Sequence, residues 1–291
     1  MTPVPDWLTP VLPGHTAEAW EALGTILPPH AYLGGGTAIA AHLQHRVSRD
    51  LEVFFEEEPD LDALERALQE RGPTVTMRKG NGTLDCVFGS TKVQLLAAVG
   101  HNLIEPALPV AGIRVAGLGD LMAMKLRAIT DRGEHRDYLD LATIENDGGR
   151  QVEEGLAYFV ARFAPENPDE AVSTVLRSLG YLGDIEDDPA LRVSVEELQQ
   201  YWASRIPQII THAGRFGYGY PESITGAQDE ELALAEIAAL RRFSAATGPI
   251  GPHRPVSGKC KVLTRKRRRC PFDALSGLGI CGIHRAAQGR R

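Results

Sequence analysis

The sequence predicts an α+β fold, in which a small mixed sheet with helices on one side is followed by a helical region and a small cysteine-containing C-terminal segment. Short apolar runs separated by turn residues lie between residues 31 and 116, as is typical of strands. From about residue 118 to residue 213, apolar residues recur mainly at helical spacing. After Gly248 the composition changes to a proline- and glycine-rich stretch and then to cysteines and basic residues. We therefore expect a core over 14–146, a helical region over 147–245, a linker over 246–258 and a basic segment over 259–291.

The elements of the core can be placed from apolar spacing and from turn residues. Trp20, Leu23 and Ile26 recur at helical spacing before two prolines, which indicates a helix that ends there. Glycine-containing turns separate the later apolar runs, as in hairpins. In chain order we expect a helix over 16–26, a strand–helix–strand unit over 32–55, a helix over 60–71, a hairpin around 80–82, a strand after 89–90, a short strand at 112–116, and helices over 118–130 and from 134.

Asp50 and Glu52 are the first candidates for chemistry. They lie two residues apart on a predicted strand, so both carboxylates point to one face. Before this strand a glycine run opens a helix, where unscreened backbone N–H groups and the positive end of the helix dipole can bind phosphate. Carboxylate oxygens suit Mg²⁺. Together with Gly35, Gly36 and Thr37, the two acids therefore predict a site for Mg²⁺ and a nucleoside triphosphate.

A second candidate group lies on the two helices that follow the sheet. Lys125 falls in the apolar stretch 121–126, where a lysine is costly unless its ammonium meets an anion. Arg132 and Arg136 would lie on the same side of a continuous helix, although Gly133 breaks it. A triphosphate is a suitable anion for lysine and arginine. We therefore expect Lys125 and Arg132 to bind the nucleotide.

These motifs resemble a known family. Two glycines, a spacer of about a dozen residues and Asp-x-Asp/Glu look like the nucleotidyltransferase superfamily that includes DNA polymerase β. The runs GGGTAIA…HRVSRDLEVFF and LGDLMAMKLRAITDRGEHRDYLDL resemble the AbiEii/AbiGii toxin family of nucleotidyltransferases, over roughly residues 30–145 and more weakly to about 215. Where that family usually has a second aspartate, this chain has Glu52. The resemblance implies a polymerase-β-like nucleotidyltransferase core.

The resemblance also implies roles for individual residues. Arg46 and Ser48, between the glycine helix and the carboxylate strand, are further candidate nucleotide-binding residues. Lys125 and the nearby acids would belong to the active site, with Asp137 or Asp140 either orienting Lys125 or acting as a base; the sequence leaves both roles open.

A third catalytic carboxylate is common in this superfamily. At the corresponding kind of strand position this chain has Gln94. Asp85, on the preceding strand, is a candidate, and the alternative is that it is an edge-strand aspartate that faces water.

The C-terminal segment carries a second motif, Cys260-x9-Cys270-x10-Cys281-x2-His284. Four soft or borderline ligands within 25 residues suit tetrahedral Zn²⁺, and a short segment with few large apolar residues needs such a staple to fold. The segment also resembles small zinc knuckles. The alternative is a basic tail with incidental cysteines.

The charge of the chain is divided unevenly. From residue 254 to the end there are eleven Lys or Arg and one acid, so a net charge of +10 leaves −17 for the remainder of a chain whose total is −7. A basic cluster over 265–269 suits a nucleic-acid backbone. The alternative is a solubilising terminus.

The sequence thus predicts a Mg²⁺-dependent nucleotidyltransferase that moves a nucleoside monophosphate from an NTP to an acceptor. The resemblance implies a toxin of a toxin–antitoxin or phage-defence system, with RNA or tRNA as the acceptor and a cognate antitoxin as partner. Two alternatives remain: a transferase that modifies a protein or a small molecule, and a catalytically weak protein that binds nucleic acid through its tail. No apolar run of eighteen residues or signal peptide is found, so we expect a cytoplasmic protein without membrane contact.

Overall fold

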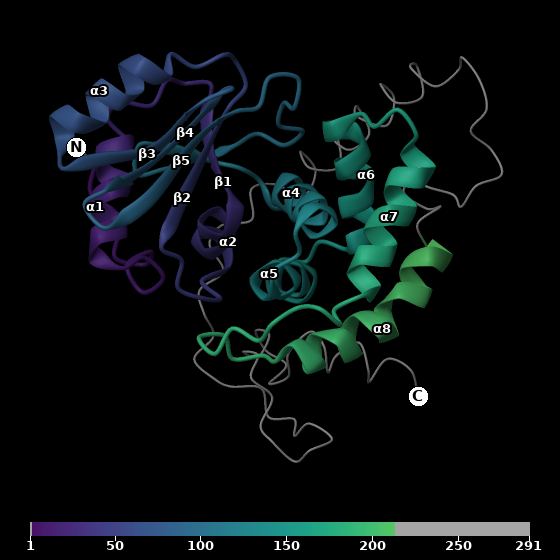
Figure 1. The fold of residues 1–291 in the computed structure, drawn as a ribbon. Helices are drawn as coiled ribbons and strands as arrows, with labels where there is room; N and C mark the ends of the chain where they lie inside the picture. The colour runs from purple at the N-terminus through teal and green to yellow at the C-terminus, as the bar shows by residue number, and fades with distance from the viewer. Residues whose placement is uncertain (1, 213–291) are drawn as a thin grey trace.

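A computed structural model describes residues 2–212 of the chain (Figure 1). The described part combines helices and strands in the order that an α+β fold requires. The elements are α1 (Gly14–Leu23), β1 (Ala31–Gly34), α2 (Gly35–Leu43), β2 (Asp50–Phe55), α3 (Leu61–Arg71), β3 (Thr74–Gly80), β4 (Thr83–Phe88), β5 (Thr91–Ala97), β6 (Leu108–Val110), β7 (Ile113–Val115), α4 (Leu118–Asp131), α5 (His135–Asn146), α6 (Val152–Phe163), α7 (Pro168–Gly180) and α8 (Val195–His212).

The strands form one seven-stranded mixed sheet in the order β3-β4-β5-β2-β1-β7-β6. β2 lies at its centre, antiparallel to β1 and parallel to β5. Helix α2 connects β1 to β2 and starts at Gly35, directly after the last residue of β1. The glycine run at the start of α2 therefore lies beside the carboxylate strand, with Gly34 directly opposite Glu52 in the pairing register.

The two faces of the central strands differ in burial. Leu51, Val53 and Phe55 of β2 are fully buried, whereas Asp50, Glu52 and their neighbours on the other face remain partly exposed. Helices α1 and α3 cover the buried face, since α1 contacts β2 and β5 and α3 contacts β3 and β4. Burying this apolar face stabilises the sheet and leaves its polar face open.

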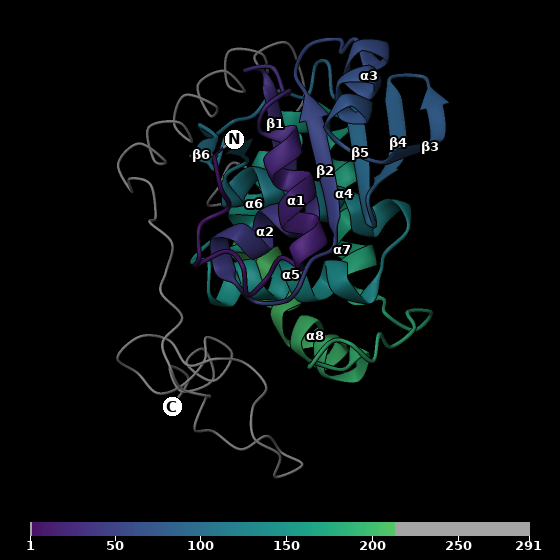
Figure 2. The ribbon, with the colours of Figure 1, turned by 90° about the vertical axis from the view of Figure 1, so that its left-hand side faces the viewer.

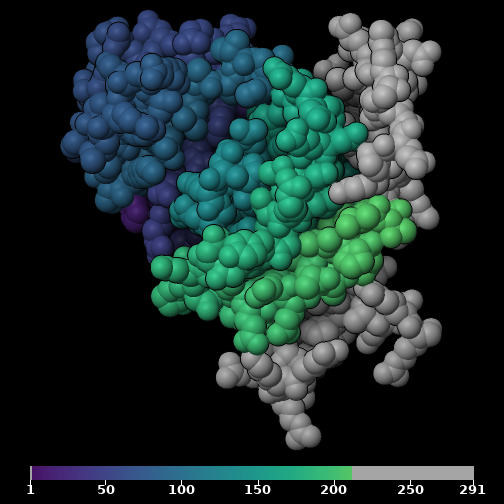
Figure 3. All heavy atoms as spheres, turned by 45° about the vertical axis from the view of Figure 1, so that its right-hand side comes forward, coloured from purple at the N-terminus to yellow at the C-terminus, as the bar shows by residue number. Residues whose placement is uncertain are grey.

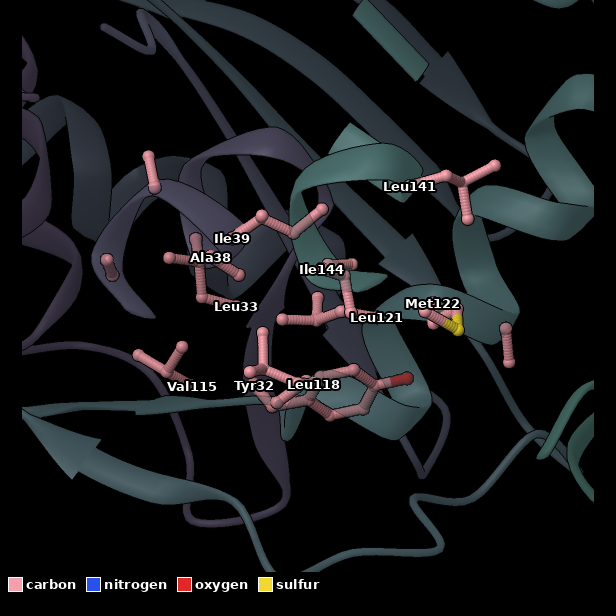
Figure 4. Packing of buried hydrophobic residues seen from close by; sticks show 14 of the residues in the cluster. Tyr32, Leu33, Ala38, Ile39, Val115, Leu118, Leu121, Met122, Leu141 and Ile144 are labelled. Carbon is pink, nitrogen blue, oxygen red and sulfur yellow. The ribbon is translucent and has the colours of Figure 1, made fainter. Parts of the chain in front are cut away.

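Helices α4 and α5 pack on α2 beside this open face (Figure 1). Between them lies an apolar core of residues from β1, α2, β7, α4 and α5 (Figure 4). Its members include Tyr32, Leu33, Ile39, Val115, Leu121 and Ile144, which are almost completely buried. This packing holds the two candidate groups of the sequence, on β2 and on α4 and α5, in one rigid unit.

The helices that follow pack behind α4 and α5 (Figure 2). Arg162 of α6 donates to Asp120 of α4 at 3.0 Å, and both side chains are buried. Arg205 of α8 pairs with Glu145 of α5 at 2.9 Å. These ion pairs therefore join the helices of the region after residue 146 to the core. Within residues 2–212, no helix combines the length and apolarity needed to cross a membrane.

The sheet is larger than the sequence predicted, because β6 was not expected. Leu108–Val110 contains a proline and is too short to show an alternating pattern. It pairs with β7 through a two-residue turn at Ala111 and Gly112, both of which have positive φ. This is the geometry of a tight hairpin, but its sequence lacks the usual Asn-Gly or Asp-Gly signal.

Candidate active site

The carboxylates of Asp50 and Glu52 lie on the open face of β2. They alternate with the buried Leu51 and Val53, so both point away from the core, as predicted. Within residues 2–212, neither carboxylate takes part in a hydrogen bond or an ion pair, and each is partly exposed. Two unpaired carboxylates on a central strand are free to bind a cation.

The glycine run allows charged side chains to approach the start of α2 closely. A Cβ on Gly35, whose φ is +65°, would lie 2.1 Å from Glu52 Oε2. A Cβ on Gly36 would lie 2.1 Å from Arg46 Nη2. No side chain of the described residues caps the N-terminus of α2, so the backbone N–H groups of its first turn can receive an anion. The glycines therefore place helix N–H groups, a carboxylate and a guanidinium against one another.

Asp140 of α5 connects the two candidate groups. Arg46 donates two parallel hydrogen bonds to its carboxylate, at 2.7 and 2.8 Å. Lys125 of α4 lies 2.9 Å from Asp140 Oδ2 and donates to Asp137 Oδ1 at 2.6 Å. Both aspartates are completely buried, and His45 Nε2 lies 2.7 Å from Asp140 Oδ1. The acidic partners that Lys125 requires in its apolar surroundings are thus supplied by the protein itself.

The local sequence positions both aspartates. Asp137 is the third residue of α5, and its Oδ2 also accepts the backbone N–H of Glu134 in a capping box. Asp140 follows one turn later on the same side of the helix. Gly133, with φ of +52°, lets the chain turn between α4 and α5 so that this side faces Lys125. Such buried contacts favour an orienting role for both acids.

The pKa values of the cluster reflect competition between burial and charge. Burial alone would raise the pKa of Asp140, but the charges of Lys125 and Arg46 and the hydrogen bonds from Arg46 and His45 hold it well below its usual range. Burial would lower the pKa of Lys125, yet Asp140, Asp137 and Glu52 raise it. Lys125 and Arg46 are therefore cations beside the open face of β2.

His45 is the one neutral base in this cluster. Burial lowers its pKa below the usual 6.5, since desolvation outweighs the hydrogen bond and the charge of Asp140. As the pH drops below about 6.5, the unfolded chain therefore binds a proton at this residue more readily than the folded chain, so the free energy of unfolding falls through that range. Between about pH 7.5 and pH 5.5, His45→Gln should reduce this loss by up to about 1.4 kcal/mol.

Urea unfolding of both proteins at the two pH values measures this effect. The comparison with wild type removes the contributions of His42 and His101, whose pKa values are also lowered by burial, and of Asp120, whose pKa burial raises to about 6. An equal loss of stability in the wild-type and His45→Gln proteins would show that His45 is protonated in the folded state.

The remaining predicted nucleotide-binding residues are placed differently. The Thr37 hydroxyl is buried and hydrogen-bonds to the Asp50 carbonyl oxygen and, at 2.6 Å, to Ser48 Oγ, so both hydroxyls tie the loop before β2 to α2. Arg132 is half exposed and pairs with Glu134 at 3.3 Å. Arg136 also pairs with Glu134, at 2.5 Å. The helix break therefore keeps both arginines out of the buried cluster around Lys125.

A cleft opens between the polar face of the sheet and helices α4 and α6, with a cavity volume of about 330 Å³. Glu52, Gly35 and Lys125 line one part of it, and Arg132 lies on its rim. The space-filling view shows the surface hollowed between the strands and these helices (Figure 3). The cleft thus brings together carboxylate, helix N-terminus and ammonium.

The candidates for a third carboxylate lie in the same row of the sheet. Gln94 of β5 is directly opposite Glu52, and Asp85 of β4 is directly opposite Gln94. Gln94 Nε2 donates to Asp85 Oδ1 at 2.9 Å, and Arg78 donates to Asp85 Oδ2 at 2.8 Å. Because β4 is flanked by β3 and β5, Asp85 does not lie on an edge strand. Asp85 is occupied by Gln94 and Arg78, so within residues 2–212 Asp50 and Glu52 remain the unpaired acids on this face of β2.

The two carboxylates on β2 suit Mg²⁺, whereas a metal ion held entirely by protein side chains would need more ligands. Among residues 2–212, no cluster of three or more His, Cys, Asp or Glu side chains is arranged to hold a metal ion. Mg²⁺ keeps several waters and is commonly held by one or two carboxylates together with substrate phosphates. Asp50 and Glu52 supply such a pair. The predicted Zn²⁺ ligands Cys260, Cys270, Cys281 and His284 lie outside the described residues.

Sequence reasoning missed His45. Its Nε2 contacts Asp140, which lies 95 residues further along the chain. Its Nδ1 has no hydrogen-bond partner among the described residues. The only local signal was its position directly before Arg46 and just after α2, which ends at Leu43 and is followed by Gln44 in the left-handed conformation. Nothing in the sequence pairs it with α5.

The carboxylate, helix N-terminus and buried lysine of this cleft are groups that a nucleotidyltransferase requires, and the comparison with protein families gives that class of enzyme. Residues 84–215 match the family described as nucleotidyl transferase AbiEii toxin, Type IV TA system. This part of the chain, 132 of its 291 residues, is similar to the AbiEii nucleotidyltransferase family. The match contains Lys125, Asp137 and Asp140 and begins after Asp50 and Glu52, which the structure joins to the matched helices through Asp140.

Other proteins resemble parts of this chain. An uncharacterised protein of Aquifex aeolicus (strain VF5) is 26% identical over 182 residues, which cover 59% of this chain and 80% of that protein. MenT4, a nucleotidyltransferase toxin from Mycobacterium tuberculosis, is similar with a TM-score of 0.49 at 14% identity, covering 77% of this chain and 95% of its own. The antibiotic-resistance factor ANT(2'')-Ia has a TM-score of 0.28 at 17% identity, covering 68% and 94%.

Proposed function

We propose that this nucleotidyltransferase moves a nucleoside monophosphate from an NTP to an RNA acceptor, most simply tRNA, with Mg²⁺ at Asp50 and Glu52. The observation that carries this proposal is the pair of carboxylates on β2 that have no partner among residues 2–212. One of them, Glu52, lines a cleft together with Gly35, at the start of α2, and Lys125. Bound Mg²⁺ would neutralise charge on the phosphates during the displacement.

The charge of each residue at the site would determine its role in the reaction. Backbone N–H groups at Gly35 and Gly36 would bind the phosphates at the positive end of α2. Lys125 and Arg46, both held by Asp140, would stabilise the charge that develops as pyrophosphate leaves. Because Asp140 and Asp137 are buried and bound to these cations, they would position them rather than accept a proton from the acceptor.

The acceptor and the partner are proposed from sequence and family. The cluster of basic residues over 265–269 suits a nucleic-acid backbone, and zinc held by the neighbouring cysteines and histidine would order it. The match of residues 84–215 to a family described as the toxin of a Type IV TA system supports a cognate antitoxin that restrains the activity in the cell.

Label transfer tests the proposal. The full chain is incubated with Mg²⁺, total tRNA and each NTP in turn, labelled at the α-phosphate, beside Asp50→Ala. We expect label on tRNA with the wild-type protein and none with the variant or after chelation of Mg²⁺. Label that appears only on protein or on a small molecule would replace the proposed acceptor. The absence of label with every NTP and acceptor would contradict the proposal.

A further inference from the structure

The cleft continues past the two carboxylates along β2. Phe54 lies on the same face as Glu52, two residues further along the strand, or about 7 Å away at the usual rise per residue. Ala98 and His101, in the chain that leaves β5, line the cleft beyond it. The open face of the strand therefore changes from charged to apolar and aromatic within one cleft.

Phe54 is held firmly at this transition. Its ring stacks on Tyr32, with centroids 5.7 Å apart and an interplanar angle of 17°. A Cβ on Gly34 would lie 2.7 Å from both Phe54 Cε2 and Met124 Cε, so these two side chains meet directly over the end of β1. Phe54 and Met124 form an apolar surface next to the start of α2, where the phosphates are proposed to bind.

Phe163 and His101 form the far end of the cleft. Their ring centroids lie 5.2 Å apart in an edge-to-face arrangement. The Arg162 guanidinium lies 5.7 Å from the Phe163 ring centroid and is itself fixed by its ion pair with Asp120. Phe163 is half-buried and His101 is exposed, so both rings keep surface that a ligand can cover. Such a ring, ordered by its neighbours but open on one side, is suited to stacking.

We propose that this aromatic end, formed by Phe54, Met124, His101 and Phe163, binds the base and ribose of the NTP. The inference rests on the proposed function, which puts the triphosphate at Glu52, Gly35 and Lys125. The nucleoside must then extend away from the charged residues, and the cleft offers an apolar surface about 7 Å further on. A cavity of about 330 Å³ is in the usual range for small-molecule sites.

The same surface predicts how selective the site is. Stacking contributes to the binding of every base because each has a π-face, whereas discrimination requires polar groups that read base edges. The Arg162 side chain, which lines this cleft beside Phe163, already donates to Asp120, Tyr32 and the Asn102 carbonyl oxygen. We therefore expect the aromatic end to add affinity for all four NTPs rather than to select one.

Binding of the full chain to each NTP and to inorganic tripolyphosphate, in the presence of Mg²⁺ and without acceptor, tests the inference by titration calorimetry. Phe163→Ala should weaken the binding of every NTP at least about fivefold and leave tripolyphosphate affinity unchanged, since base–aromatic stacking contributes at least about this much. His101→Ala, at an exposed position, should act in the same direction and leave the fold intact. Tyr181→Ala, at an exposed aromatic residue that does not line the cleft, is the matched control and should change neither affinity.

The outcomes separate the two proposals. If the wild-type protein binds NTP and both cleft variants bind it with unchanged affinity, the aromatic end does not bind the nucleoside, and the proposed function is left intact. Equal weakening of NTP and tripolyphosphate would also overturn it, because the effect would then be on the phosphates. A wild-type protein that binds no NTP would overturn the proposed function and this inference together.

Discussion

Replacing Asp140 with asparagine is expected to lower the free energy of unfolding by about 3–5 kcal/mol, the usual cost of removing one partner from a buried ion pair. The substitution keeps the shape of the side chain but removes the charge that Arg46 and Lys125 share. Both cations are nearly buried, with side-chain exposures of 11% and 8%, so water cannot replace the lost carboxylate. Urea unfolding at neutral pH measures the change, and label transfer on the surviving folded protein should also fall.

Asp62→Asn is the matched control for this prediction. Asp62 also pairs with a lysine, Lys79, but its side chain is 67% exposed. Exposed ion pairs contribute little to stability because water screens them, so the control should change the free energy of unfolding far less than Asp140→Asn does. If Asp140→Asn were as stable as Asp62→Asn, the cluster around Asp140 would not be the buried charged network described above.

Glu52→Gln is expected to show the opposite pattern, a large loss of activity with little loss of stability. The amide keeps the size of the side chain but lacks the negative charge that would hold Mg²⁺. Removing one electrostatic group from a reaction centre typically costs on the order of 10²–10³ in rate. Because Glu52 is partly exposed and has no hydrogen-bond or ion-pair partner within residues 2–212, we expect the free energy of unfolding to change by less than about 1 kcal/mol. Initial rates of label transfer and urea unfolding test the two halves.

Two further variants sharpen this test. Glu52→Asp keeps the charge and should retain more activity than Glu52→Gln. Glu58→Gln makes the same chemical change at an exposed acid just after β2 and should leave the rate unaltered. Equal activity of wild type and Glu52→Gln would remove Glu52 from the proposed metal site.

Much of the candidate site was predictable because it depends on local periodicity. Asp50 and Glu52 share a face because strand side chains alternate, and the sequence showed this spacing directly. Asp137 and Asp140 share a helix face because they are three residues apart. The need of Lys125 for an anion followed from its apolar neighbours. Each of these statements needs only the residues within one element.

The partners of these residues were not predictable in the same way. The sequence suggested a triphosphate as the anion for Lys125 and left open whether Asp137 or Asp140 orients it; the structure places both acids on its ammonium. It grouped Arg132 and Arg136 with Lys125, and the turn at Gly133 directs them to Glu134 instead. Such pairings depend on how α5 packs back against α2 and α4, which no spacing within one helix determines.

The sequence by itself therefore determined the class of fold, the two carboxylates on β2 and the uncapped glycine start of α2, because these follow from the periods of strands and helices and from the missing Cβ of glycine. Only the tertiary structure decided that Asp140 joins Arg46 and His45 to Lys125, across almost a hundred residues of chain. It also decided that aromatic residues of β2 and α6 line one cleft with Glu52. Contacts of this kind arise when separate apolar faces pack together, and burial then forces each charge to find a partner.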